Sequence, residues 1–413
     1  MKYEPMVKSL LDTDAYKLSM GQVYHHQWGN DKATWDFKAR NVGTNFEHES
    51  YTEKDVQEIK EQIKAYCSLR FQPEELDYLR KAFPWIHNDY INFLSFWHPR
   101  YEDFEISHEG PSGLKITFKG VQEYVSFYEI PVLEICAEVY YRSHYDYDKL
   151  FDDFKKETED KLAKIRDGAF NLETWSEFGA RRRLSYNAQD WLIGRLVEEK
   201  RKYPTGAMKG FVGTSNVYLA MKYNIKAVGT MAHEFVELFQ GHRQYNLSYS
   251  NWFAMDSWIR EYGVWNGIAL TDTLGLDIFL KDFNRTFATV FSGVRHDSGD
   301  PIVWGDKMIA HYKKLGIDPL TKTLLFSDSL DGEKATKIAN YFKGKANVAF
   351  GIGTWWSAPQ NIKPLNIVCK TVLVNGGDVV KLSDSPGKCM CRNPEYIDFA
   401  KRAIEWRLQH ETN

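Results

Sequence analysis

The stretch that decides the fold is Ile225-Lys-Ala-Val-Gly-Thr-Met-Ala-His-Glu-Phe-Val-Glu-Leu-Phe-Gln240. The apolar run 225–228 has strand character, a Gly-Thr turn follows it, and the residues from Ala232 onward have the apolar spacing of a helix. His233 is therefore predicted where a strand ends and a helix begins. In a β/α barrel this rim carries the chemistry, although a single histidine at a helix start is more often a capping or packing residue.

Six further apolar runs end in small, polar or charged residues, and a predicted helix follows each of them. The run ends are Glu177-Phe-Gly-Ala-Arg-Arg-Arg183, Val212-Gly-Thr-Ser-Asn216, Leu270-Thr-Asp-Thr273, Gly293-Val-Arg-His-Asp-Ser-Gly-Asp300, Phe326-Ser-Asp-Ser329 and Phe350-Gly-Ile-Gly-Thr354. Seven such transitions predict parallel strands that close into a barrel, with a doubly wound open sheet as the alternative. In either fold the polar ends converge on one rim.

The flanking segments predict a second layer. Before the barrel, strands are expected at 34–40, 104–107, 114–118 and 123–127, and helices at 15–28, 52–69, 73–83, 88–97, 131–145 and 148–166. After it, strands 366–374 and 379–382 flank the turn Asn375-Gly-Gly-Asp378, and a helix spans 394–408. We expect an N-terminal α+β domain at 1–130, a barrel at 131–365, and a C-terminal hairpin and helix at 366–413 that rejoin the N-terminal domain.

Composition narrows the classes of function. The 413 residues carry a formal net charge of −3, so neither a basic excess for nucleic acid nor an acidic tail for a basic partner is present. The five cysteines are odd in number and scattered, which favours a reducing compartment over a disulfide framework. The N-terminus lacks an apolar signal segment, and no apolar run is long enough to span a membrane. These features predict a soluble, cytoplasmic protein.

The rim is suited to phosphates. Gly351, Gly353 and Thr354 leave backbone N–H groups open at a helix start, late in the barrel, where phosphate sites are common, although glycines also mark plain turns. The three arginines 181–183 have forked donors that pair with phosphate, and we expect one or two of them to be merely solvated. Asp297 and Asp300 suit ribose hydroxyls or Mg²⁺ on a diphosphate, while Asp300 ahead of Pro301 also suits helix capping.

Together these motifs resemble the bacterial type of nicotinate phosphoribosyltransferase, a type II phosphoribosyltransferase family, nearly end to end. The matching segments are Leu10-Leu-Asp-Thr-Asp-Ala-Tyr-Lys17, Glu177–Arg183, Gly213-Thr-Ser-Asn216, Gly229-Thr-Met-Ala-His-Glu234, Gly293–Pro301, Phe326-Ser-Asp-Ser-Leu-Asp331 and Lys381-Leu-Ser-Asp-Ser-Pro-Gly-Lys388. The resemblance implies an irregular α/β barrel with an N-terminal open-faced α+β sandwich that the C-terminal segment completes.

The resemblance also implies a reaction. Nicotinate and phosphoribosyl pyrophosphate would give nicotinate mononucleotide and pyrophosphate, a step of NAD biosynthesis. ATP hydrolysis would be coupled to it through a phosphohistidine at His233. Mg²⁺ would be held mainly by substrate phosphates, with no protein ligand assigned. No nucleic-acid or membrane partner is expected, and the protein would be a homodimer with shared active sites.

Residue roles follow from the matching motifs. Phe178 and, from the other subunit, Tyr16 would sandwich the pyridine ring, and Arg295 would face the nicotinate carboxylate. Arg181 and Asp297 would serve the ribosyl and pyrophosphate groups, and Gly351, Gly353 and Thr354 would cradle the 5′-phosphate. Ser215 and Asp328 complete the expected substrate-binding set. One departure lies after Thr354, where Trp355-Trp356-Ser-Ala-Pro359 replaces the polar residues and slightly longer loop common in the family, which puts contacts beyond the phosphate cradle in doubt.

Three alternatives stay open at this point. A nicotinamide phosphoribosyltransferase would favour an acidic acceptor where this chain has Ser215. A metal-dependent barrel hydrolase would use His233 and the rim aspartates, but a catalytic Zn²⁺ usually takes several clustered histidines. The third alternative, a binding protein without catalysis, is disfavoured by Arg295, Asp297 and His233.

Overall fold

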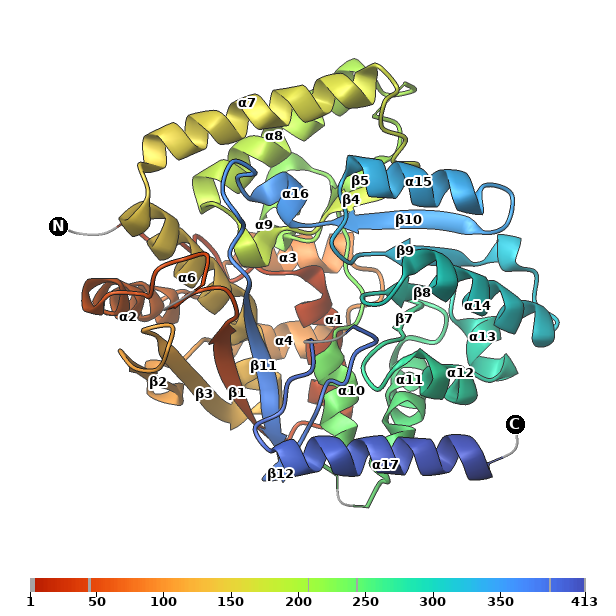
Figure 1. The fold of residues 1–413 in the computed structure, drawn as a ribbon. Coiled ribbons are helices and arrows are strands. Elements are labelled where there is room, and N and C mark those ends of the chain that lie inside the picture. The colour runs from red at the N-terminus through yellow and green to blue at the C-terminus, as the bar shows by residue number, and fades with distance from the viewer. Residues whose placement is uncertain (1–3, 44–45, 207, 243, 386–387, 412–413) are drawn as a thin grey trace.

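The fold is taken from a computed structural model, which describes residues 4–43, 46–206, 208–242, 244–385 and 388–411. A parallel sheet and an antiparallel sheet organise these residues, and helices surround both sheets (Figure 1). The predicted combination of an α/β barrel with a separate antiparallel layer is confirmed.

Seven strands form the parallel sheet in the order β6-β5-β4-β10-β9-β8-β7. They are β4 (Trp175–Glu177), β5 (Phe211–Thr214), β6 (Lys226–Ala227), β7 (Ile268–Leu270), β8 (Gly293–His296), β9 (Thr323–Phe326) and β10 (Asn347–Ile352). The first strand, β4, lies beside the last, β10, which is the neighbour relation of a β/α barrel rather than of a doubly wound sheet. Among the described residues no ladder joins β6 to β7, so the barrel is irregular and open between them.

Helices alternate with these strands and cover the outside of the barrel (Figure 1). They are α8 (Tyr186–Lys202), α9 (Val217–Tyr223), α10 (His233–Gln240), α11 (Ser250–Tyr262), α12 (Leu276–Asp282), α13 (Arg285–Val290), α14 (Pro301–Lys314), α15 (Gly332–Phe342) and α16 (Thr354–Ser357). The predicted cap of α14 is confirmed: Asp300 Oδ1 accepts hydrogen bonds from the N–H groups of Ile302 and Val303, both at 2.9 Å.

The antiparallel sheet has the order β12-β11-β1-β3-β2 and takes strands from both ends of the chain. These are β1 (Lys32–Ala39), β2 (Phe104–Ser107), β3 (Lys115–Val121), β11 (Ile367–Val374) and β12 (Gly377–Asp378). The N-terminal helices are α1 (Ala15–Gln27), α2 (Glu53–Cys67), α3 (Pro73–Ala82), α4 (Asn88–Phe96), α5 (Gln122–Val125), α6 (Glu129–His144) and α7 (Tyr147–Arg166). The central β1–β11 pairing makes the C-terminal segment part of the N-terminal layer.

Two strand predictions are wrong. Segment 123–127 forms α5 and a following 3₁₀ turn, because the chain must reverse there from β3 into α6, and both of its faces are largely buried. Segment 379–382 is not a ladder strand: the hairpin partner of β11 is only Gly377–Asp378, and Lys381 makes a single bridge to Met390.

The C-terminal helix α17 (Pro394–His410) corrects a further expectation, because it does not follow the hairpin into the N-terminal layer. Arg407 donates a hydrogen bond at 2.5 Å to Asp282 of α12, and Ile404 packs with Ile278 of the same helix. The helix therefore ties the end of the chain to the outside of the barrel.

Candidate functional site

The C-terminal ends of the parallel strands open into a cavity of about 410 Å³ that the antiparallel sheet covers. One wall is the barrel rim, and the other comes from α6, β11 and the end of β1. The residues predicted from the sequence that line it are Tyr16, Phe178, Arg181, Ser215, His233, Arg295, Asp297, Asp328, Gly353 and Thr354. The structure therefore brings together residues that lie as far apart in the sequence as α1 and α16.

His233, the first residue of α10, is held in a network of charges. Its Nε2 lies 2.9 Å from Asp272 Oδ1 and 3.5 Å from Asp297 Oδ2. Lys381 Nζ reaches the same two carboxylates at 3.1 and 3.5 Å. Burial and the charge of Lys381 lower the pKa of His233 to about 4, so its ring is neutral near pH 7. With Nε2–H donated to Asp272, the lone pair of the neutral ring lies on Nδ1.

His233, Asp272 and Asp297 are also close enough together to hold a metal ion. However, the Lys381 ammonium already provides these carboxylates with a cation. Burial raises the pKa of Asp297, but the charges of Lys381 and Arg295 outweigh burial and hold that pKa below its usual range. This arrangement is a positioned neutral histidine, which disfavours the metal-dependent hydrolase.

Arg295, on β8, is buried but incompletely bonded. Its Nη1 donates to Thr230 Oγ1 at 2.6 Å, and its buried Nε has no hydrogen-bond partner among the described residues. A buried guanidinium with unused donors at a cavity wall is suited to a carboxylate ligand, because the fork can bind both oxygens.

Tyr16 and Phe178 line the same cavity within one chain. The start of α1 is pinned to the rim: Ala15 N–H donates to the Ser215 carbonyl at 2.8 Å, and a side chain at Gly229 would lie 2.6 Å from the backbone nitrogen of Tyr16. The N-terminal layer of this chain therefore brings Tyr16 to its own barrel rim. The supply of Tyr16 by a second subunit stays a prediction, which the mixing of variants proposed below tests.

Gly351 does not line the cavity, in contrast to its predicted place in a phosphate cradle. It lies beneath Phe178: a Cβ at position 351 would be 2.3 Å from the Cδ2 atom of that ring. Gly353 and Thr354 do line the cavity. Glycine at 351 therefore serves the close approach of the aromatic side chain.

The three consecutive arginines have different surroundings, and none is simply solvated. Arg181 and Arg182 both line the cavity, and Arg182 also donates to the Asn366 side chain at 3.0 Å and to the Ile367 carbonyl at 3.2 Å. Arg183 is fully buried and forms a two-point ion pair with Asp12, at 2.7 and 3.0 Å. Of the three, Arg181 alone forms no such hydrogen bond or ion pair with the described residues.

The Trp355-Trp356 departure is explained by packing. Trp356 is fully buried and stacks on Trp175 of β4, with ring centroids 5.2 Å apart. Trp355 packs edge-on against Phe170, at 5.7 Å. The two tryptophans pack α16 against the barrel on the side away from the cavity. The Trp355-Trp356 sequence therefore changes the core beneath Gly353 and Thr354 rather than the cavity wall.

Several residues of the site have no role predicted from the sequence. Lys370, Lys381 and Lys388 reach the cavity from the C-terminal segment, and Lys388 Nζ pairs with Asp328 at 2.6 Å. Asp272 is the carboxylate that orients His233. The matching motifs and strand ends contain Lys381, Lys388 and Asp272. However, a lysine in a predicted strand such as 379–382 is expected to face solvent, so only the tertiary fold reveals that Lys381 is buried.

The cavity also contains Asp14, whose Oδ1 accepts a 2.5 Å hydrogen bond from Ser215 Oγ. Burial raises the pKa of Asp14, and the charge of Arg181 opposes that effect. An acidic group therefore lies at the position where the sequence offered only a serine.

Comparison with known proteins agrees with this geometry. Residues 174–406 match the model of the nicotinate phosphoribosyltransferase (NAPRTase) family, and residues 11–137 match that of the NAPRTase N-terminal domain. The chain belongs to the nicotinate phosphoribosyltransferase family. Similar relatives are the nicotinate phosphoribosyltransferase of Chromobacterium violaceum, 40% identical over 98% of each chain, and nicotinate phosphoribosyltransferase 2 of Pseudomonas aeruginosa, 39% identical over 97% of this chain and 98% of that protein.

Solved structures of the same family have the same fold. The nicotinate phosphoribosyltransferase of Vibrio cholerae matches with a TM-score of 0.86 and 33% identity, over 97% of this chain and 94% of that one. That of Porphyromonas gingivalis matches with a TM-score of 0.85 and 30% identity, over 97% of this chain and 100% of that one. The family thus shares both the barrel and its antiparallel cover.

Within the part of the chain that the structure describes, no helix combines the length and the apolar character that crossing a bilayer requires.

Proposed function

We propose that this chain condenses nicotinate with phosphoribosyl pyrophosphate to give nicotinate mononucleotide and pyrophosphate, as a step of NAD biosynthesis. The observation that carries the proposal is the buried Arg295, with its unused donors, in the same cavity as Phe178 and Tyr16. A cation for the carboxylate and aromatic faces for the ring match a pyridine carboxylate. A rate assay with nicotinate against nicotinamide tests it, and equal or faster turnover of nicotinamide would contradict it.

The chemistry needs positioning and charge rather than a covalent nucleophile. The pyridine nitrogen forms a bond to the ribosyl C1 as the bond from C1 to the pyrophosphate oxygen breaks. Arg181 and the lysines of the cavity are placed to stabilise the negative charge that develops on the leaving group. The aromatic pair holds the ring nitrogen in line with C1, so that the free energy of binding is used to hold the reacting atoms in the reactive geometry.

The proposed reaction includes Mg²⁺ bound to the phosphates of the substrate. Asp297 and Asp328 are the cavity carboxylates that retain exposure, 24% and 21% of their side chains, and their oxygen donors suit this hard cation. Bound Mg²⁺ supplies charge neutralisation to the pyrophosphate. We assign these two side chains only as the protein groups able to face it.

We further propose that ATP hydrolysis is coupled to synthesis through phosphorylation of His233. The lone pair on Nδ1 attacks the γ-phosphorus, the bond to the ADP oxygen breaks, and Nε2–H stays donated to Asp272, whose charge balances the ring. Hydrolysis of the N–P bond by water restores the neutral histidine. The low pKa of His233 supports this role, because only the neutral ring is a nucleophile.

Nicotinamide remains the second candidate substrate because of Asp14. A carboxylate in the cavity can accept a hydrogen bond from the amide group of nicotinamide, as a nicotinamide phosphoribosyltransferase would require. Its Oδ1 is already engaged by Ser215. The positive charge of Arg295 in the same cavity favours nicotinate over the neutral amide.

Alanine at Gly351 is expected to raise the KM for nicotinate several-fold by displacing Phe178. An aromatic stack is worth about 0.5–1.5 kcal/mol, which sets that scale. The control is Gly206→Ala, where the added Cβ would meet nothing closer than 3.8 Å. Steady-state kinetics and a melting curve test the pair, and an unchanged KM in a Gly351→Ala protein of normal Tm would remove Phe178 from the ring site.

Mixing Tyr16→Ala protein with Phe178→Ala protein is expected to recover no activity if the ring clamp is built within one chain, where both residues line one cavity. Nicotinate mononucleotide formation is measured after subunit exchange and compared with the average of the two separate variants. Recovery well above that average would return Tyr16 to a partner subunit. We also propose that the protein is a homodimer, which a measurement of its molar mass in solution tests.

A further inference from the structure

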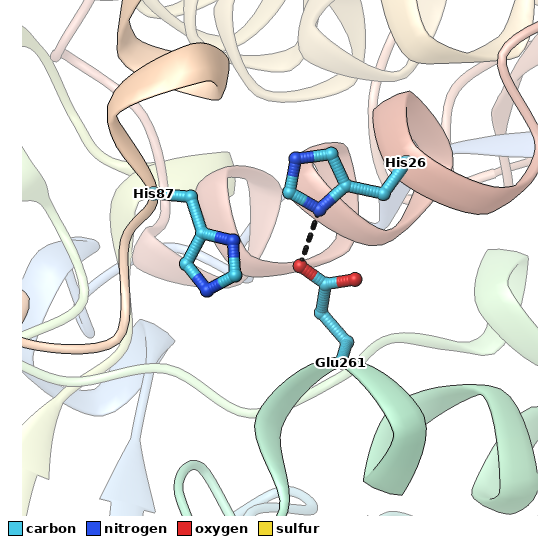
Figure 2. A group of neighbouring side chains, drawn as sticks. All are labelled: His26, His87 and Glu261. Atoms are coloured by element: carbon cyan, nitrogen blue, oxygen red, sulfur yellow. Dashed lines mark hydrogen bonds and ion pairs between the residues drawn. The ribbon is translucent and has the colours of Figure 1, made fainter.

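A second cluster of ligating side chains lies away from the cavity, where three helical elements meet. His26 is on the last turn of α1, His87 immediately precedes α4, and Glu261 is near the end of α11. Each offers one ligand atom, and these atoms all lie within 4.8 Å of one another. Figure 2 shows the two rings and the carboxylate turned toward a common point. Tyr16 is on the first turn of α1, so the cluster lies about 15 Å along the helix from the cavity.

The donor set is specific in its chemistry. Two imidazoles and one carboxylate are ligands for Zn²⁺ and neighbouring transition metals, whereas Mg²⁺ and Ca²⁺ prefer oxygen alone. Ligand atoms on a tetrahedral Zn²⁺ lie about 3.3 Å apart, so side-chain shifts of about 1 Å convert the cluster into a site. The His87 side chain is exposed, which leaves a path for entry and a fourth position for water.

Each ligand is oriented by a second layer of polar groups. Glu261 accepts hydrogen bonds from the side-chain amides of Gln22, at 2.8 Å, and Gln27, at 3.2 Å. The backbone N–H of His87 donates to the Gln22 side-chain oxygen at 2.8 Å. Such outer contacts orient metal ligands in known sites and raise their affinity.

His26 has the arrangement of a metal-binding histidine. Its Nδ1 lies 2.6 Å from Glu261 Oε1, and its Nε2 lies 3.3 Å from Asp89 Oδ2. This Nε2 is buried and has no aligned hydrogen-bond partner among the described residues. A ring bound to metal through Nδ1 would direct its Nε2–H toward the Asp89 carboxylate, which is the carboxylate–histidine–metal relation. The charges of Glu261 and Asp89 would together balance a divalent ion.

We propose that His26, His87 and Glu261 form a binding site for a divalent transition metal, Zn²⁺ in the first place. The metal takes the position of the proton between His26 Nδ1 and Glu261 Oε1, and that proton is released to solvent. The site joins α1, whose first turn lines the cavity, to α11, which packs against the His233 helix α10. The metal therefore stabilises the contact between the N-terminal layer and the barrel helices.

The test uses full-length protein with its purification tag removed and its metals stripped by a chelator. Zn²⁺ binding is measured by equilibrium dialysis with elemental analysis, and Co²⁺ is added separately to read the intense visible absorption of a tetrahedral site. The variants are His87→Ala and Glu261→Gln, and the matched control is His410→Ala, an exposed histidine on α17. Melting curves without metal check that each variant is folded.

We expect wild type and His410→Ala to retain one Zn²⁺ more per chain than His87→Ala and Glu261→Gln, and only the first two to gain a raised Tm with Zn²⁺. His233, Asp272 and Asp297 are intact in all four proteins, so Zn²⁺ held there cancels in the comparison. Equal Zn²⁺ content in wild type and both cluster variants would overturn the proposal and leave His26 as an ordinary ion-pair partner of Glu261 and Asp89. Activity without Zn²⁺ is expected to be equal in wild type and His87→Ala.

Discussion

Replacing Arg295 by alanine is expected to raise the KM for nicotinate at least tenfold. A charge-assisted hydrogen bond to a carboxylate contributes about 1.5–3 kcal/mol, which corresponds to a factor of roughly 10–150. We expect the effect in the upper part of this range, because Arg295 is only 7% exposed and its Nε has no other partner among the described residues.

Steady-state kinetics with nicotinate and with phosphoribosyl pyrophosphate varied in turn measure this loss. The matched variant is Arg295→Lys, which keeps the charge but loses the fork, and an intermediate KM is expected for it. The KM for phosphoribosyl pyrophosphate should change much less. A wild-type KM for nicotinate in Arg295→Ala would mean that another cation of the cavity holds the carboxylate.

Replacing His233 by alanine is expected to abolish the acid-labile phosphoenzyme and the stimulation by ATP, while slow ATP-independent synthesis persists. The reason is that the neutral Nδ1 is the proposed phosphoryl acceptor, whereas positioning of the two substrates depends on other residues of the cavity. Labelling with γ-³²P-ATP under alkaline quench and product formation with and without ATP measure the two losses.

The control for this prediction is His296→Gln, because His296 lies on the same rim but is not among the residues that line the cavity. It should be labelled as wild type is. ATP stimulation that is unchanged in His233→Ala would exclude the phosphohistidine. A phosphoenzyme that persists without stimulation would place the phosphate on another residue.

The pH dependence of phosphorylation follows from the same histidine. Its pKa is lowered from the ordinary value to about 4, so the nucleophilic neutral form persists as pH falls from 7 to 5 and is lost only near pH 4. The extent of initial phosphoenzyme formation in a brief pH jump should therefore stay flat across pH 5–7. A midpoint near the ordinary histidine pKa of about 6.5 would mean that the imidazole is solvated rather than buried.

The sequence by itself determined the parallel sheet. Each of the seven apolar runs that end in Gly, Ser, Thr, Asp or Arg became a strand, because a strand buried on both faces must be apolar along its length while its end reaches the rim. The same logic placed Phe178, Arg295 and His233 on the rim, since their positions depend only on where each strand ends.

Local sequence patterns predict structure less well where a segment packs against residues that are distant in the sequence. Segment 123–127 alternates like a strand, but the turn from β3 into α6 decided its helical form. The motif 381–388 was visible as a string of residues, yet nothing local shows that Lys381 is buried beside Asp272 and Asp297. Long-range burial reverses what propensity and alternation indicate, because it depends on what packs against the segment.

Only the tertiary structure decided which layer covers the rim. The sequence leaves open how near Tyr16 lies to the rim of its own chain, and the hydrogen bond from Ala15 N–H to the Ser215 carbonyl brings it there. The tertiary structure also separates three adjacent arginines: Arg181 and Arg182 line the cavity, whereas Arg183 forms a buried ion pair. It likewise brings His26, His87 and Glu261 to one point. Sequence spacing fixes where a side chain sits on its own element, whereas contacts between elements distant in the chain depend on how whole elements pack.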